Sequence, residues 1–262
     1  MKKFFNMFFL LTFSPWPLML SLNLMNFMMG FINFFMKQGL TLMIFGIMMI
    51  LLIFYQWWRD VIRESIFLGG HSFKMMKGMK IGMMMFILSE IMFFISFFWS
   101  YFHGYLSPTI EIGLLWCPKM IYMFNPFSVP LFNTMILLSS GMTVTLCHMK
   151  MINGEKNMLY MYMLTILLGL MFTYMQLNEY KDAMFMISDS MYGSIFYMLT
   201  GFHGLHVLIG TIFLIVMLIR FMHYELSSSF HLGFEFCSWY WHFVDVIWLI
   251  LYFLLLFFFF YI

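Results

Sequence analysis

Long apolar runs alternate with short polar segments along the whole chain. Each run has about twenty residues or more, which is the length that an α-helix needs to cross the hydrocarbon core of a bilayer. We predict seven membrane-spanning helices, in Ser14–Met36, Gly39–Trp58, Gly78–His103, Pro126–His148, Met158–Leu177, Ser190–Ile219 and Phe230–Ile262. The predicted fold class is therefore all-α, a polytopic membrane protein with seven transmembrane helices.

The composition also points to a membrane protein. Of 262 residues, 64% are hydrophobic and 9% are charged, and the mean hydropathy is +0.93. A soluble domain cannot cover its surface with so few charges. There are 34 methionines and 37 phenylalanines, whereas alanine occurs once, at Ala183. Because alanine is a favoured helix residue, this bias indicates a GC-poor coding genome, of the animal mitochondrial kind, rather than a structural need.

The basic residues are distributed unevenly between the two sides. If the N-terminus lies on the inner side, seven crossings place ten of the thirteen lysines and arginines there. These ten are Lys2, Lys3, Arg59, Arg63, Lys74, Lys77, Lys80, Lys150, Lys156 and Arg220, and the three outer ones are Lys37, Lys119 and Lys181. Such asymmetry follows the positive-inside rule. We therefore predict an N-terminus in the matrix and a C-terminus in the intermembrane space of a mitochondrial inner membrane.

A lone carboxyl group, that of Glu90, lies near the middle of the third apolar run. An ionised carboxylate at this depth costs roughly 3 kcal/mol, and such groups are usually functional. With no lysine or arginine within two helical turns, desolvation favours the neutral acid. Two interpretations stay open: a protonated acid hydrogen-bonded inside a bundle, or a group with a role in proton or lipid chemistry. We hypothesise that its partner is His206, which is predicted at a similar depth.

The last apolar run carries a polar stripe. Its members recur at steps of four, three, four and three residues, which places them on one helical face: His231, Glu235, Ser238, His242 and Asp245. Polar groups in lipid need partners inside the protein, so this face is predicted to point into the bundle. A hydrogen-bond network between helices, a proton path and ligand binding are all compatible with the stripe.

The sixth run contains His203 and His206. Together with His242 they permit a haem hypothesis, because histidine is an ordinary haem ligand. A buried, hydrogen-bonded histidine is the commoner outcome. In the first run Asn23, Asn26, Gly30 and Asn33 share one face, and this face is predicted to contact the second run.

The second run ends in aromatic and charged residues. These are Trp57, Trp58, Arg59, Asp60, Arg63 and Glu64. Interfacial tryptophans followed by arginines suit anionic lipid headgroups, because the arginine fork matches phosphate. His71 and Arg220 are predicted on the same side and extend this candidate lipid-binding rim. An ordinary interfacial anchor with local ion pairs is the alternative.

Four groups of segments occur together and in a fixed order. They are W-W-R-D-V-I-R-E-S (57–65); S-E-I-M-F-F with F-F-W (89–94 and 97–99); F-H-G-L-H-V (202–207); and G-F-E with W-Y-W-H-F-V-D-V-I-W (233–235 and 239–248). In these segments, and over essentially its whole length, the chain closely resembles the mitochondrial cytochrome c oxidase subunit III family. The resemblance implies seven helices without metal, of which the first two splay from the other five to form a V-shaped cleft filled with phospholipid.

The resemblance also implies partners and site residues. Haem and copper belong to partner subunits I and II, and this chain would stabilise subunit I during turnover, support proton uptake and contact small accessory subunits. Its own ligand would be phospholipid, with no cofactor and no nucleic acid. Glu90 matches the carboxylate that carbodiimides modify, and Arg63, Glu64 and His71 match positions near the cleft lipids. We expect helices 1–2 within residues 1–70 and helices 3–7 within residues 71–262.

The chain departs from the family at three places where a His-His pair is usual. Here Gly70-His71, His148-Met149 and Phe230-His231 each keep one histidine, which puts any role that needs both imidazoles in doubt. Two other functions also stay open. One is a di-haem membrane cytochrome that uses His203 or His206 with His242, and the other is an autonomous proton channel centred on Glu90 and Asp245.

Overall fold

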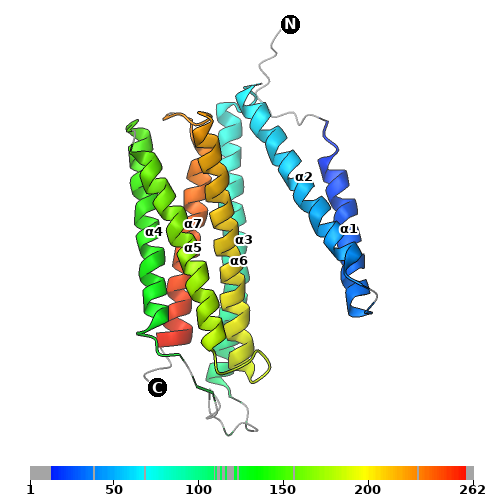
Figure 1. The fold of residues 1–262 in the computed structure, drawn as a ribbon, viewed down its shortest axis with the longest axis vertical. Helices are drawn as coiled ribbons and strands as arrows, with labels where there is room; N and C mark the ends of the chain where they lie inside the picture. Colours follow the sequence, from blue (N-terminus) through cyan, green and yellow to red (C-terminus); the bar gives the residue numbers. More distant parts are fainter. Residues whose placement is uncertain are drawn as a thin grey trace. The chain divides into compact units, whose positions relative to one another are not determined.

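The computed structural model describes residues 13–257 except 38, 68, 109, 111–112, 114–115, 117–120, 123, 156 and 229. Over these residues the chain is helical and has no strand (Figure 1). The helices are α1 (Trp16–Phe35), α2 (Thr41–Ile66), α3 (Phe73–Leu106), α4 (Val129–Ile152), α5 (Met158–Asp182), α6 (Met191–Met222) and α7 (Leu232–Leu251), which the π-helical segment η2 (Tyr252–Phe257) continues. In the described part, seven helices are long and apolar enough to cross a membrane. The predicted fold class is confirmed.

Several helices extend beyond the predicted apolar runs. α2 continues past Trp58 to Ile66, α3 begins at Phe73 instead of Gly78, and α5 ends at Asp182 instead of Leu177. Hydropathy falls where charged residues begin, but a helix can continue into the headgroup region, which adds 10–15 Å to the apolar core of a bilayer in total. Both chain ends lie outside the described residues. So do four of the lysines on which the predicted orientation rests: Lys2, Lys3, Lys119 and Lys156.

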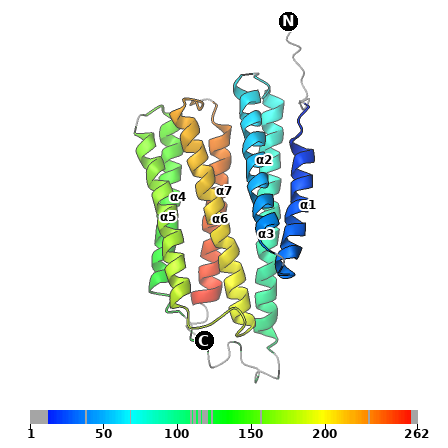
Figure 2. The same cartoon turned by 45° about the vertical axis from the view of Figure 1, so that its right-hand side comes forward.

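The chain divides into two compact units, Met1–Lys80 and Ile81–Ile262. In the first unit α1 and α2 pack side by side as an antiparallel hairpin (Figure 2). The predicted contact face of α1 is confirmed, because Asn23 and Gly30 are its buried residues. A Cβ atom on Gly30 would lie 2.6 Å from the backbone nitrogen of Met43 in α2. The missing side chain is therefore what lets the two backbones approach.

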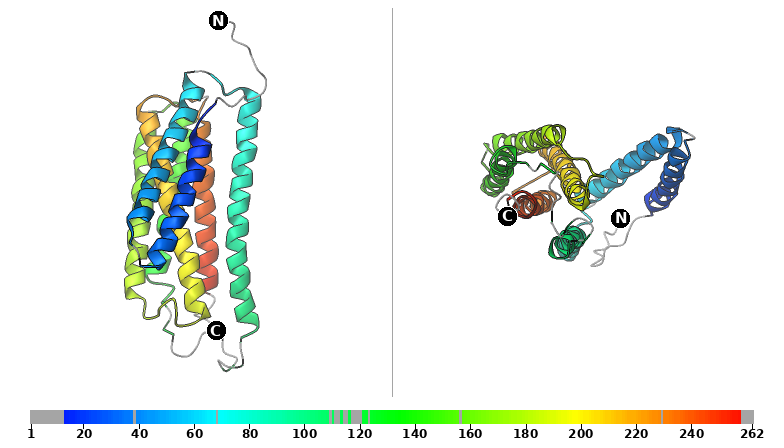
Figure 3. Two further views of the ribbon diagram at one scale, coloured as in Figure 1. Left: turned by 90° about the vertical axis from the view of Figure 1, so that its right-hand side faces the viewer. Right: turned by 90° about the horizontal axis from the view of Figure 1, so that it is seen from below.

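The second unit holds the larger core. α4 packs against α5 and α7, while α6 packs against α5 and α7, and Figure 3 shows these four helices grouped together. The start of α4, the end of α5, the start of α6 and the end of α7 share one end of this bundle (Figure 1).

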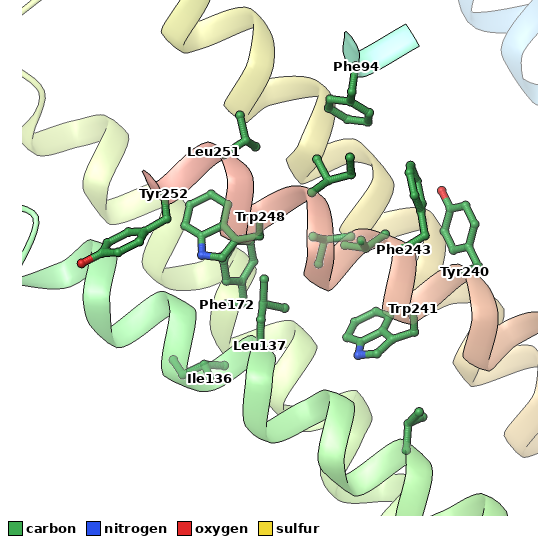
Figure 4. Close-up of a cluster of buried hydrophobic side chains, with 14 of the residues drawn as sticks. Phe94, Ile136, Leu137, Phe172, Tyr240, Trp241, Phe243, Trp248, Leu251 and Tyr252 are labelled. Atoms are coloured by element: carbon green, nitrogen blue, oxygen red, sulfur yellow. The ribbon is translucent and has the colours of Figure 1, made fainter. Parts of the chain in front are cut away.

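Aromatic side chains from α7 fill the centre of this bundle (Figure 4). Trp241 and Trp248 are fully buried, and the Trp248 ring lies edge-on to Phe172 of α5, with 4.8 Å between ring centroids. The Trp241 indole N–H donates a hydrogen bond of 2.9 Å to the Ser140 hydroxyl of α4. In lipid, such packing and interhelical hydrogen bonding replace the hydrophobic effect as the source of helix association.

Candidate functional site

The structure brings Glu90 of α3 and His206 of α6 together. Their Oε2 and Nε2 atoms are 3.1 Å apart, and the side chains are 25% and 11% exposed. The two residues are 116 positions apart in the sequence, yet they share a depth in the bundle. The carboxyl group that lacks a neighbouring cation in the sequence thus has an imidazole as its hydrogen-bond partner.

The other ring nitrogen of His206 determines what this pair can be. Its Nδ1 atom lies 2.6 Å from the carbonyl oxygen of Phe202. A carbonyl oxygen only accepts hydrogen bonds, so Nδ1 carries a hydrogen. His206 Nε2 then either accepts a proton from neutral Glu90 or, as imidazolium, donates one to its carboxylate. In both forms the pair has no net charge and shares a single proton, which makes it compatible with an apolar setting.

Aromatic rings surround the pair. Phe94 of α3 is fully buried, and its ring centroid lies 5.1 Å from that of His206. The ring centroids of Tyr240 and Phe243, both of α7, lie 6.4 and 6.2 Å from the centroid of the same imidazole. These rings exclude water from one side of the pair and strengthen its electrostatic interaction.

An apolar groove runs beside Glu90 in the second unit. Its volume is about 320 Å³, and its lining comes from α3 and α7: Met84, Ile87, Leu88, Ile91 and Trp239. Ile87 and Ile91 flank Glu90 on α3. The groove is therefore lined by apolar side chains, and it lies next to the turn of α3 that carries Glu90.

The polar stripe of α7 falls into two groups. At its start, His231 Nε2 lies 3.2 Å from His148 Nε2 of α4 and 3.8 Å from Glu235 Oε1. At its end, His242 Nδ1 lies 3.9 Å from Asp245 Oδ2. Asp245 is buried, whereas the His242 side chain is 41% exposed. The start of the stripe thus supplies a contact between α7 and α4, whereas the His242–Asp245 contact at its end lies within α7. His148 is a partner that the sequence reading missed.

Histidine geometry does not favour the di-haem hypothesis. Both nitrogens of His206 already have partners, Phe202 and Glu90. His203 is fully buried between two rings, with its centroid 5.0 Å from Trp248 and 5.7 Å from Phe172. Among the described residues, no group of three or more His, Cys, Asp or Glu is arranged to hold a metal ion.

The charged end of α2 contains a clamp within the first unit. Two nitrogens of Arg59 contact Asp60 Oδ1 at 2.9 and 3.1 Å, and the indole N–H of Trp16 donates to Asp60 Oδ2 at 2.8 Å. Asp60 thereby ties the start of α1 to the end of α2, and Arg59 holds the Asp60 carboxylate from within α2. Arg63 and Trp58 are exposed, so these two side chains are the more accessible members of the predicted lipid rim.

The remaining rim residues lie in both units. Trp57 is half-buried at the end of α2, and the backbone N–H of Gly70 donates to the Glu64 carbonyl, which brings the segment before His71 back to that helix end. Arg220 belongs to the second unit and donates to Glu225 at 2.9 Å. Lipid binding by these residues stays a prediction.

The sequence reading also missed a buried carboxyl group, that of Glu179. The predicted fifth run ends at Leu177, but α5 continues to Asp182, and Glu179 is 2% exposed. The signal that could have found it is the spacing of Phe172, Gln176 and Glu179, at steps of four and three residues on one helical face.

Comparison with known proteins identifies a family. The family model of cytochrome c oxidase subunit III matches residues 6–261. The chain is 49% identical over 246 residues to cytochrome c oxidase subunit 3 of Anopheles gambiae, with 94% of each chain covered. It is 49% identical over 248 residues to the protein of that name from Heterololigo bleekeri, with 94% of this chain and 96% of the relative covered. It is 47% identical over 246 residues to that of Drosophila melanogaster, with 94% of each chain covered. The chain therefore belongs to the cytochrome c oxidase subunit III family.

Proposed function

We propose that this chain is a core, metal-free subunit of a proton-pumping cytochrome c oxidase in the mitochondrial inner membrane. In this role it stabilises subunit I during turnover, binds phospholipid and supports proton uptake, while electron transfer from cytochrome c to oxygen takes place in subunits I and II. Small accessory subunits complete its protein partners. The N-terminus faces the matrix and the C-terminus faces the intermembrane space, in line with the distribution of basic residues.

The observation that carries this proposal is the Glu90–His206 pair. Its two side chains share one proton within an aromatic shell, and its heavy atoms are 3.1 Å apart. Because one residue comes from α3 and the other from α6, the pair joins two helices without placing a net charge in lipid. Such a pair can hold the bundle together and can also exchange its proton with a neighbouring path.

Lipid binding rests on a separate group of residues. The apolar groove beside Glu90 offers acyl-chain contacts, and the exposed guanidinium of Arg63 offers two parallel hydrogen bonds to a phosphate.

Removal of this chain from the intact oxidase tests the proposal. We expect haem and copper to stay entirely with the remaining subunits, as measured by optical spectra and metal content before and after stripping. Initial oxidase activity should survive, but it should decay faster during turnover. Haem leaving with this chain would favour the di-haem alternative, and proton flux through the reconstituted chain alone would favour an autonomous channel.

The two arginines of α2 should differ in their effect on bound lipid. Arg63→Gln is expected to weaken retention of anionic phospholipid about fivefold, because one arginine near an anionic headgroup contributes about 1 kcal/mol. Arg59→Gln should leave lipid retention closer to wild type, because Arg59 is already engaged by Asp60. Lipid phosphorus per oxidase, measured after graded detergent washing, checks this. Equal losses in the two variants would contradict the assignment to Arg63.

A further inference from the structure

A second cluster of buried polar side chains lies in the α4–α7 bundle, separate from the Glu90–His206 pair. Its four members are nearly or fully inaccessible to solvent: Asn133 of α4 (0% exposed), Gln176 and Glu179 of α5 (6% and 2%) and His203 of α6 (0%). Asn133 Nδ2 donates a long hydrogen bond of 3.4 Å to Glu179 Oε2. We call these four residues the amide–carboxyl cluster.

Contacts between α5 and α6 place its members at neighbouring levels. On α5, Phe172 contacts the His203 ring at 5.7 Å, and the Tyr180 hydroxyl lies 2.6 Å from the Thr200 hydroxyl. Gln176 lies midway between Phe172 and Tyr180 on the same helical face. It therefore lies between the levels of Thr200 and His203, and Glu179 follows one turn later beside Asn133.

Most polar atoms of the cluster have no hydrogen-bond partner among the described residues. These atoms are Asn133 Oδ1, Glu179 Oε1, both side-chain polar atoms of Gln176 and both ring nitrogens of His203. Gln176 lies near the Tyr180 hydroxyl, but neither of its amide atoms has hydrogen-bond geometry to it. Buried polar groups in folded proteins almost always have a partner, either protein or ordered water.

The donor and acceptor inventory defines the missing partner. The amide oxygen of Asn133 can only accept, whereas Gln176 offers both a donor and an acceptor, and a neutral imidazole such as His203 does too. The Thr200 hydroxyl donates its hydrogen to the carbonyl oxygen of Phe196. The Tyr180 hydroxyl must therefore donate to Thr200, and the Tyr180 oxygen can still accept a further hydrogen bond. A ligand that satisfies all these atoms must both donate and accept hydrogen bonds over short distances, and water does so.

We propose that the amide–carboxyl cluster is an internal water site, in which bound water bridges Glu179 and Asn133 to Gln176 and His203. Buried waters typically make about three hydrogen bonds to polar groups of this kind. His203 precedes His206 by one turn of α6. Through His203 the site thus reaches to within one helical turn of the Glu90–His206 pair along α6. This inference is independent of the role proposed for that pair.

High-resolution electron cryo-microscopy of the intact oxidase tests the water site. The expected result is water density within hydrogen-bond distance of Glu179 Oε1 and Asn133 Oδ1. Direct pairing of the four side chains, with no density between them, would overturn the proposal. So would density that grows stronger when rubidium replaces potassium in the buffer, because that outcome identifies a cation site.

Two variants at Glu179 sharpen the test. Glu179→Gln keeps a polar group of the same size and should retain the bridging density, whereas Glu179→Leu should lose it. Asp182→Leu is the matched control, because it removes an exposed carboxylate three residues further along α5. If Glu179→Leu fails to assemble, the Glu179→Gln map decides alone: retained density supports the water site, and loss of the density there contradicts it.

Discussion

Replacing Glu90 by leucine is expected to weaken the attachment of α3 to α6. The variant leaves His206 Nε2 without its partner, because the Phe202 carbonyl engages the other ring nitrogen. A buried polar atom that loses its partner costs about 1–3 kcal/mol, which corresponds to roughly 5- to 150-fold in an equilibrium constant. Thermal dissociation of this chain from the purified oxidase, followed by native electrophoresis, measures the effect.

Glu90→Gln is the matched variant, and we expect it to assemble nearly as well as the wild type. The glutamine amide can donate to His206 Nε2 as the neutral acid does, so the cost should stay below about 1 kcal/mol. If the pair instead exists as carboxylate and imidazolium, Glu90→Gln leaves a partly buried cation without its counter-charge. Loss of assembly in this variant would therefore rule out the neutral form as the structural one.

Gly30→Ala is expected to disrupt the hairpin of α1 and α2. The added Cβ atom would lie 2.6 Å from Met43 N and 2.9 Å from Leu42 C, which are backbone atoms that cannot rotate away. Overpacking of this kind typically costs about 1–3 kcal/mol. Faster amide hydrogen exchange in α1 and α2 peptides of the assembled oxidase, measured by mass spectrometry, should reveal the loosened packing.

Gly78→Ala serves as the control for this prediction. Gly78 is also inside a helix, but no atom lies within 4 Å of its added Cβ position. The intrinsic preference of helices for alanine over glycine then predicts a neutral to slightly stabilising effect of up to about 1 kcal/mol. Similar exchange rates in the Gly30→Ala and Gly78→Ala variants would show that backbone approach at Gly30 is unimportant.

The sequence predicts most of the helical architecture because each element is determined locally. A run of about twenty apolar residues must form a helix in lipid, since its backbone groups have no other hydrogen-bond partners there. The contact face of α1 follows equally directly, because Asn23 and Gly30 share a face and Gly30 has no side chain to separate the backbones. The ends of α2, α3 and α5 are less predictable, since helices continue past the apolar runs into charged sequence.

The pairing of side chains across helices depends on tertiary structure. Depth in the membrane makes His206 a candidate partner of Glu90, but only the packing of α3 against α6 brings the two atoms to 3.1 Å. The Phe202 carbonyl then fixes which nitrogen of His206 carries hydrogen. Glu179 illustrates the same limit, because α5 carries it into the bundle beside Asn133 of α4. By itself the sequence determined the helices and their polar faces, since both depend on local periodicity; the tertiary structure decided which polar groups meet, because such contacts depend on how separate helices pack.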